Sequence, residues 1–224
     1  MIANVEASGM NNAVVARKNS GVLAPADLKG KRIGFTPGTT SDFFLDSLLT
    51  VHGITRHAIQ AVAMKPEEML DAIENKKVDA VCTWNYPLAQ IKKRLGNNGV
   101  VFSDRTIYTE TYNVAAQQEF VQKNPETVKR FLRAIIKAEN FTAKHTEEAQ
   151  AIMSASSKID IDLVREAWKA FNYQVVLDQR LVITLEDETQ WAMKNKLTDQ
   201  TVMPDYRKFI HFDSLKAVKP EAIR

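Results

Sequence analysis

Hydrophobic and polar positions follow two patterns in the first half of the chain. Short apolar runs, typical of buried strands, alternate with stretches whose apolar residues recur three or four positions apart, which is typical of helices. The strands expected on this basis are Asn12–Arg17, Arg32–Thr36, Ala58–Ala63, Val78–Thr83, Val100–Ser103 and Thr111–Ala116. The expected helices are Asp42–His52, a helix from Pro66 to about Lys76, and Pro87–Leu95. This alternation predicts an α/β unit with a mainly parallel sheet.

From Asn124 onward the pattern becomes mainly helical. Asn124 suits an N-cap and Pro125 a first helical turn, and a long apolar face follows them. Further helices are expected at Glu147–Ala155, Leu163–Tyr173 and Leu185–Asn195, the last opened by Thr184 and Asp187 in capping-box spacing. The β-branched stretch Gln174–Ile183 between the last two predicts a strand.

Charge and cysteine content narrow the function classes. The chain has 224 residues, and 30 Lys and Arg against 27 Asp and Glu leave a net charge of only +3, so no nucleic-acid partner is expected. The single cysteine, Cys82, excludes an internal disulfide and lies in the apolar run VDAVCTW, where a buried structural thiol is expected. No apolar run approaches the ~20 residues of a transmembrane helix, and Met1–Met10 lacks the features of a secretory signal. We therefore expect a soluble chain without direct membrane insertion.

The stretch FTPGTTS, Phe35–Ser41, offers the strongest candidate for ligand binding. It lies between an expected strand and an expected helix, and Gly38 allows a tight turn. The amides and hydroxyls of Thr39, Thr40 and Ser41 would then face outward from a positive helix end, a position that favours an anionic ligand. The alternative is that Thr40 or Ser41 only caps the helix. A nucleotide loop is excluded because its lysine and glycine spacing are missing.

Two other stretches place polar and aromatic residues at strand ends. In TWNYP, Trp84 and Asn85 follow a buried strand and could offer an aromatic wall and an amide to a small ligand, although Trp84 could equally pack under the next helix. In TETYN, Glu110 or Asn113 could face a cleft, as could Asn12 near the chain start. For this second group, exposed polar residues of a loop are the favoured explanation.

Other chemistry is not indicated. The four histidines show no metal-binding spacing, and Asp160 with Asp162 is better interpreted as a helix start than as a catalytic pair. We expect no catalytic residue, no metal and no cofactor.

Three segments in order resemble a known family. They are NNAVVARKNSGVLAPADLKGKRIGFTPGTTSDFFL, MKPEEMLDAIENKKVDAVCTWNYPLAQ and YNVAAQQEFVQKNPETVKRFLRAI. Their order and spacing resemble the sulfonate/nitrate/taurine branch of the bacterial periplasmic substrate-binding proteins of ABC importers. The resemblance runs from Asn11 to about Lys196.

The resemblance implies a type II-like periplasmic-binding-protein fold of two α/β lobes, with the ligand in the cleft between them. Val14–Arg17 and Tyr112–Ala116 would be the crossover strands. Residues 1–30 and 106–224 would form a first lobe that lacks most of its N-terminal part, and residues 31–105 would form the second lobe. The ligand-binding residues would be Asn12, Gly38, Thr39, Thr40, Ser41, Trp84, Asn85 and Asn113.

The resemblance also implies a function. The expected protein is a solute-binding component that binds a small anion such as a sulfonate or nitrate, is periplasmic or extracytoplasmic, and delivers its ligand to a membrane permease. The alternatives are an extracytoplasmic ligand-sensing domain and a binding protein or enzyme related to the pyrimidine precursor of thiamine. The motif Trp84-Asn85-Tyr86-Pro87 lacks the acidic residue that commonly precedes this proline in the family, which weakens the case for an amine-bearing ligand such as taurine.

Overall fold

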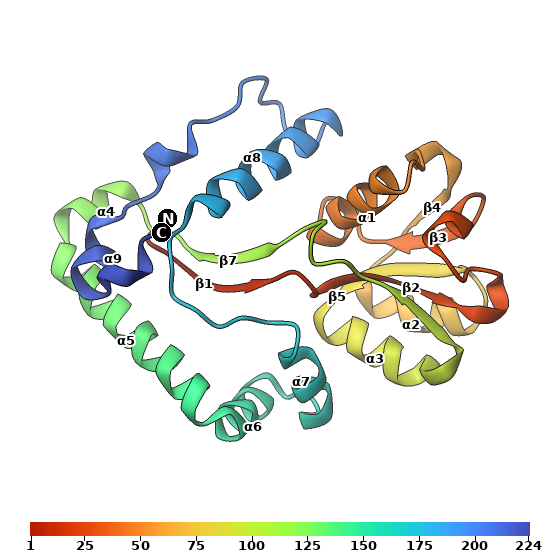
Figure 1. Ribbon diagram of the computed structural model, residues 1–224, viewed down its shortest axis with the longest axis horizontal. Helices are drawn as coiled ribbons and strands as arrows, with labels where there is room; N and C mark the ends of the chain where they lie inside the picture. Colours follow the sequence, from red (N-terminus) through yellow and green to blue (C-terminus); the bar gives the residue numbers. More distant parts are fainter. The chain divides into compact units, whose positions relative to one another are not determined.

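A computed structural model describes all 224 residues, and the chain divides into two compact units (Figure 1). Unit 1 comprises residues 1–8, 110–158 and 171–224, and unit 2 comprises residues 9–109 and 159–170. The chain therefore passes from one unit to the other four times. None of its helices combines the length and the apolarity that crossing a bilayer requires.

Unit 2 is built on a five-stranded sheet in the order β4-β3-β5-β2-β6. Its strands are β2 (Asn12–Arg17), β3 (Arg32–Phe35), β4 (Gln60–Ala63), β5 (Ala80–Trp84) and β6 (Gly99–Phe102). All five were predicted to within two residues at each end. The prediction of a mainly parallel sheet holds for β3, which runs parallel to β4 and β5. It is wrong for β2, which runs antiparallel to β5 and β6.

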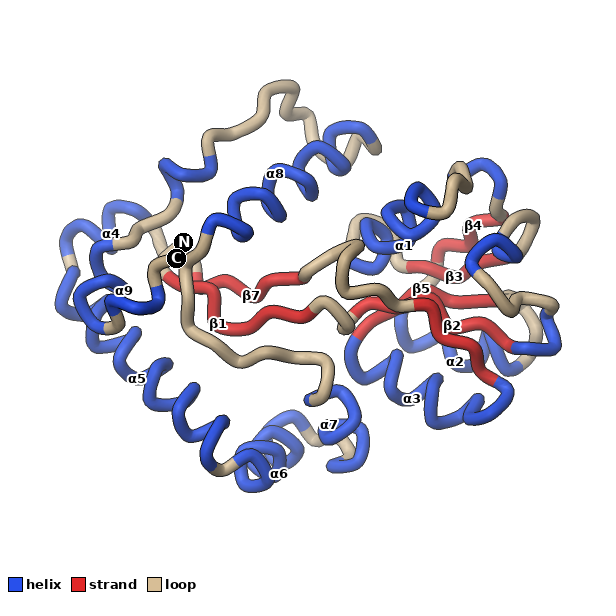
Figure 2. Tube along the Cα trace, in the orientation of Figure 1, coloured by secondary structure: helices blue, strands red, loops and turns tan.

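Helices cover both faces of this sheet, α1 (Thr40–Val51) on one side and α2 (Pro66–Glu74) with α3 (Asn85–Leu95) on the other (Figure 2). Strand β2 shows how the sequence produces this arrangement. Val14 and Ala16 pack in the cluster with α1, whereas Ala13 and Val15 pack in the cluster with α2 and α3. A strand that is apolar on both faces must be covered on both.

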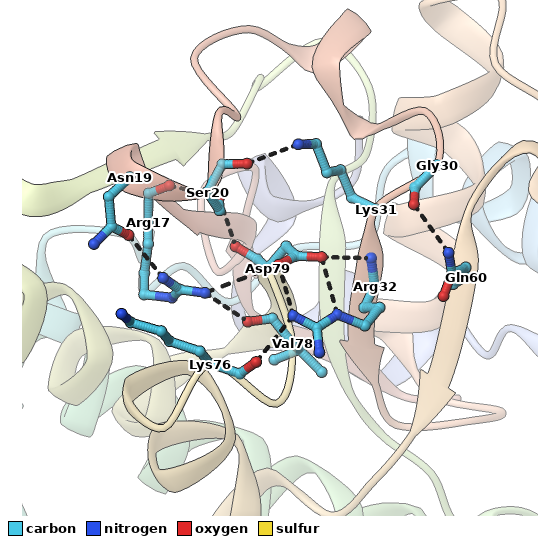
Figure 3. Close-up of polar contacts among 10 residues, drawn as sticks. All are labelled: Arg17, Asn19, Ser20, Gly30, Lys31, Arg32, Gln60, Lys76, Val78 and Asp79. Carbon is cyan, nitrogen blue, oxygen red and sulfur yellow. Dashed lines mark hydrogen bonds and ion pairs between the residues drawn. The ribbon is translucent and has the colours of Figure 1, made fainter.

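Polar contacts among charged residues connect the strands at the end of this sheet where β5 begins (Figure 3). The Asp79 carboxylate accepts hydrogen bonds from the Arg32 backbone N–H at 3.0 Å and from Arg32 Nη2 at 2.9 Å. Arg17, at the end of β2, is buried and approaches the same carboxylate to 3.9 Å, while its Nη2 donates to the Val78 carbonyl at 3.2 Å. The hydrogen bonds from Arg32 lower the pKa of Asp79, so this carboxylate remains charged and joins β2, β3 and β5.

Unit 2 also contains one helix from much later in the chain, α7 (Ile161–Trp168). The side chain of Asp160 caps it by accepting from the Asp162 amide, which confirms the expected helix start. Glu166 accepts from Lys92 of α3 at 2.9 Å, and hydrogen bonds from Lys169 and then Lys92 lower the pKa of Glu166 to about 2. This ion pair ties α7 to α3.

Unit 1 combines a two-stranded antiparallel sheet with helices. Strand β1 (Ala3–Ser8) pairs with β7 (Glu110–Val114), and isolated antiparallel bridges join Asn4 of β1 to Val176 and Ala7 to Asn172. The helices are α4 (Gln118–Lys123), α5 (Pro125–Lys144), α6 (Thr146–Ser157), α8 (Gln179–Lys194) and α9 (Asp213–Val218). Their shared apolar core contains Ala3, Val128, Leu132, Leu177, Leu181 and Leu215. Short 3-10 helices of the two units occupy Lys18–Ser20, Pro25–Leu28, Arg56–Ala58, Gly96–Asn98, Tyr206–Phe209 and Pro220–Ala222.

Several expectations for unit 1 need correction. The strand predicted at Gln174–Ile183 is absent, because Asp178 caps a helix that begins at Gln179 and its carboxylate accepts from the Arg180 amide at 2.9 Å. Thr184 therefore lies inside α8 rather than opening it. Strand β1 and helices α4 and α9 were not predicted.

The two units also differ from the expected lobes. Residues 9–30, 106–109 and 159–170 belong to unit 2. Val14–Arg17, which the resemblance assigns to a crossover, lies inside the five-stranded sheet because β2 pairs on both edges, with β5 and with β6.

Candidate functional site

The loop between β3 and α1 forms the tight turn that its sequence predicts. Gly38 has φ 69°, a left-handed conformation that side-chain-bearing residues seldom adopt. Thr39 is the extended N-cap residue and Thr40 is the first residue of α1. The N–H groups of the first helical turn have no acceptor within the helix, so the backbone amides of Thr40 and Ser41 are donors at the positive end of α1.

The hydroxyl groups of Thr39 and Ser41 form hydrogen bonds inside the loop, which differs from the outward orientation expected for them. Thr39 Oγ1 donates to the Thr36 carbonyl at 2.7 Å and lies 3.0 Å from Ser41 Oγ, so Ser41 is the donor of that pair. Ser41 is fully buried, and its carbonyl accepts from Cys82 Sγ at 3.1 Å. The hydroxyls therefore fix the loop, and the amides remain as its donors toward a ligand.

An acidic residue that the sequence analysis did not single out lies in the first turn of α1. Asp42 Oδ2 accepts from the Gly38 amide at 3.0 Å, and Asp42 Oδ1 forms an ion pair with Arg56 Nη2 at 2.9 Å. The Arg56 guanidinium also lies 4.3 Å from the centroid of the Phe35 ring. Gly38 thus supplies the turn but not a free amide. Arg56 also pairs with Asp46 at 2.6 Å, so it offsets only part of the negative charge of the two carboxylates. The signal in the sequence was an acid at the third helical position, where it favours helix formation.

Asn12 and Trp84 lie beside this loop because of the sheet register. The two residues are direct partners across the antiparallel strands β2 and β5. Thr40 Oγ1 donates to Asn12 Oδ1 at 3.4 Å, which connects the start of α1 to the same point. Asn12 is almost fully buried, whereas Trp84 is half-buried. The structure therefore brings Asn12, Thr40 and Trp84 together within unit 2.

Asn85 combines two unfavourable features at the start of α3. Its φ of 50° is left-handed, and its buried Oδ1 atom accepts no hydrogen bond from the protein. Its backbone N–H donates to Asn11 Oδ1 at 2.9 Å, which holds the residue in this conformation. Strained residues and unsatisfied polar atoms concentrate at functional sites, and this observation supports Asn85 as a candidate.

Asn113 belongs to unit 1, whereas the other predicted residues belong to unit 2. It is on β7 opposite Asn4, whose Nδ2 donates to Asn113 Oδ1 at 3.2 Å. Asn113 Nδ2 in turn donates to Thr111 Oγ1 at 3.0 Å. Its role at a ligand remains a prediction.

Cys82 is a structural residue. Its side chain is completely buried, and burial raises the pKa of its thiol far above the ordinary value. Because the thiolate is the nucleophilic form, Cys82 is unsuited to covalent catalysis.

Comparison with known proteins places the chain in a family. The family described as NMT1/THI5 like matches residues 5–149, more than half of the chain. A provisionally named binding protein of Brucella abortus (strain 2308) is 32% identical over 166 residues, which are 71% of this chain and 50% of that protein. A provisionally named aliphatic sulfonates-binding protein of Bacillus subtilis (strain 168) is 24% identical over 85% of this chain and 58% of its own length. A provisionally named thiamine biosynthesis protein of Haemophilus influenzae is 30% identical over 70% of this chain and 51% of its own length.

Solved structures agree on the fold. The periplasmic aliphatic sulphonate binding protein SsuA from Escherichia coli matches 92% of this chain and 71% of its own, with a TM-score of 0.79 and 19% identity. The desulfurization enzyme DSZB matches 98% of this chain and 79% of its own, with a TM-score of 0.69 and 14% identity. The chain has the α/β fold of the SsuA-type periplasmic binding proteins, and it spans about half the length of the first curated relatives that it matches. This chain therefore belongs to the NMT1/THI5-like family.

Proposed function

We propose that this protein is a solute-binding component of an ABC importer and that it binds a small oxyanion, such as a sulfonate or nitrate, at the start of α1. One observation carries the proposal. The Thr40 and Ser41 amides lie at a helix N-terminus, on a loop fixed by Gly38 and by internal hydroxyl bonds, beside Asn12 and Trp84. Such amides, together with the helix dipole, bind sulfate-like anions.

The charges around this helix start favour a ligand of low negative charge, such as a monoanion. The Asp42 carboxylate would repel an anion, but its oxygens are occupied by the Gly38 amide and by Arg56. Arg56 Nη1 also pairs with Asp46 at 2.6 Å, so the two carboxylates and the guanidinium carry a net charge of −1. The helix dipole at the start of α1 must outweigh this charge for an anion to bind. Trp84 would cover the organic part of a sulfonate or limit the size of the pocket.

The relatives support this class of ligand. The names of the Bacillus subtilis protein and of Escherichia coli SsuA refer to aliphatic sulfonates. By analogy with them, the protein would work outside the cytoplasm and would deliver its ligand to a membrane permease. Binding requires no covalent step, and the buried thiol of Cys82 is consistent with a protein that performs none.

A matched pair of substitutions at Thr40 tests the site. Thr40→Pro removes the first amide donor of α1, and it fits the local backbone because proline suits the first helical position and Thr39 is extended, with φ −116° and ψ 173°. Thr40→Ala removes the hydroxyl and keeps the amide. We expect Thr40→Pro to weaken sulfonate binding by about tenfold to a hundredfold, the effect of one hydrogen bond to a charged group, and Thr40→Ala to change it much less. Isothermal titration with methanesulfonate, taurine and nitrate measures this, and equal affinities for the two variants would contradict the role of the amide.

The alternative ligand class is tested by the same titration. The Haemophilus influenzae relative is named for thiamine biosynthesis, so an aminopyrimidine belongs in the panel. If the pyrimidine binds and none of the oxyanions does, the proposed ligand class is wrong.

A further inference from the structure

A small pocket lies in unit 2 between α3 and α7, the two helices that the Lys92–Glu166 ion pair joins. Its lining includes Asn85, Ala89 and Lys92 from α3, and Glu166, Ala167 and Ala170 from α7 and the turn after it. The three residues of α3 are four and three positions apart, so they lie on one face of that helix. The short side chains of the alanines leave space between the two helices.

The size of this pocket suits water rather than an organic ligand. About 40 Å³ of it is open to the centre of a water molecule, and one water needs roughly 10–15 Å³ of such space. Pockets for organic ligands usually measure about 300–1,000 Å³. The pocket therefore has room for water but not for a sulfonate with its organic part.

Asn85 brings an unused hydrogen-bond acceptor to this pocket. Its buried Oδ1 atom accepts no hydrogen bond from the protein, although the residue lines the pocket. The backbone cannot easily turn the side chain elsewhere, because the Asn85 N–H is bonded to Asn11 Oδ1 at 2.9 Å and φ is fixed at 50°. A buried acceptor of this kind is costly unless it is bonded, and ordered water often supplies the missing donor.

The charged pair at the pocket supplies the other partners that a bound water needs. Lys92 Nζ donates to Glu166 Oε1 at 2.9 Å, and an ammonium group has three donors, so Lys92 retains donors for a water oxygen. We propose that the pocket binds an ordered water molecule, which donates a hydrogen bond to Asn85 Oδ1 and accepts one from Lys92 Nζ. The water completes the bonding of Asn85 and links the start of α3, directly after Trp84, to the ion pair with α7.

Water–protein contacts in NMR spectra test the proposal in the absence of any other ligand. We expect cross-peaks between water and the methyl groups of Ala89 and Ala167, with opposite signs in NOE and ROE spectra, as for a water that stays bound. Both alanines are buried, so bulk water contributes little. Asn85→Gly tolerates the left-handed backbone and removes the acceptor, and it should weaken the cross-peaks severalfold. Cross-peaks of equal intensity in this variant would overturn the proposal, because they would then come from the Lys92 ammonium protons. Their absence from the parent protein would overturn it too.

A matched pair of leucine substitutions tests whether the water occupies this pocket. Ala170 is partly exposed at the pocket, so Ala170→Leu should fill the space and remove the cross-peaks. Ala143 is exposed on α5 in unit 1, and Ala143→Leu should leave them unchanged. Circular dichroism checks that the variants are folded. A high-resolution crystal structure of the parent protein provides a second measurement, and it would contradict the proposal if no water lay within hydrogen-bond distance of Asn85 Oδ1.

Discussion

At the scale of single residues, the candidate site depends on backbone conformation more than on side-chain chemistry. Gly38 adopts the left-handed conformation that the turn requires, Arg56 pairs with both Asp42 and Asp46, and the hydroxyls of Thr39 and Ser41 stabilise the loop. The sequence predicted that Gly38, Thr39, Thr40 and Ser41 form this turn, because glycine and hydroxyl residues between an apolar strand and an amphipathic helix favour a tight turn at a helix start. It did not predict that the hydroxyls bond inward, because hydroxyl direction depends on neighbours such as the Thr36 carbonyl.

Gly38 provides a prediction at this scale. A Cβ atom at this position would meet nothing within 4 Å, so only the left-handed backbone opposes a side chain. We expect Gly38→Ala to lower the free energy of unfolding by about 1–2 kcal/mol, the cost of placing an L-residue in that conformation. Gly38→Asn should cost less, since asparagine tolerates it better. Urea denaturation of the two variants measures the difference, and equal losses would argue against backbone strain as the cause.

At the scale of elements, the sequence predicted what local patterns determine. The strands and helices of unit 2 follow from apolar runs and from turn residues such as Pro66 and Gly53. The antiparallel direction of β2 did not follow, because strand pairing depends on residues far apart in sequence. The first turns of the helix at Gln179–Lys194 were predicted as strand because Val182 and Ile183 are β-branched. The helix cap formed by Asp178 outweighed the strand preference of these residues.

The hydrogen bonds and ion pairs of Asp79 lead to a prediction about the stability of the unit 2 sheet. Asp79→Ala would leave Arg17 buried without its counter-charge, and we expect a loss of roughly 3 kcal/mol in the free energy of unfolding, as for other broken buried pairs. Asp79→Asn keeps an acceptor for the Arg32 amide and should lose less. Because its folded pKa is lowered, Asp79 stabilises the fold above its unfolded pKa, and this contribution disappears as the pH falls through the folded value. Urea denaturation at pH 7 compares the variants; an Asp79→Ala protein as stable as the parent would contradict the assignment.

The β1–β7 pair predicts the opposite pH dependence. Glu6 pairs with Tyr112 and Glu110 with Ser8, so the two carboxyl groups are diagonal neighbours on one face of the pair. Burial, followed by the charge of Glu110, raises the pKa of Glu6 to about 7. The folded state then binds more protons than the unfolded state between the ordinary pKa of 4.5 and about 7, so stability falls as the pH rises through this window.

Replacing Glu6 tests that dependence. Between pH 5 and pH 8, we expect the free energy of unfolding to decrease less for the Glu6→Gln variant than for the parent protein. Urea denaturation at the two pH values measures this, and an identical loss in both proteins would show that Glu6 does not titrate as described.

At the scale of the whole molecule, the fold class was predictable but the division of the chain was not. The ordered segments identified the family, and the family match confirms it. The inclusion of α7 in unit 2 was not predictable, because it depends on contacts such as Lys92 with Glu166 between residues more than seventy positions apart.

The central claim is that the amides at the start of α1 bind an oxyanion. The most direct test is a titration of the ¹⁵N-labelled protein with methanesulfonate, followed by the amide signals in heteronuclear NMR spectra. The account predicts that the Thr40 and Ser41 amide signals shift progressively and saturate, together with the Trp84 indole signal, while amides near Asp79 at the far end of the sheet stay unchanged. Saturable shifts confined to other parts of the chain, with Thr40 and Ser41 unaffected, would contradict it.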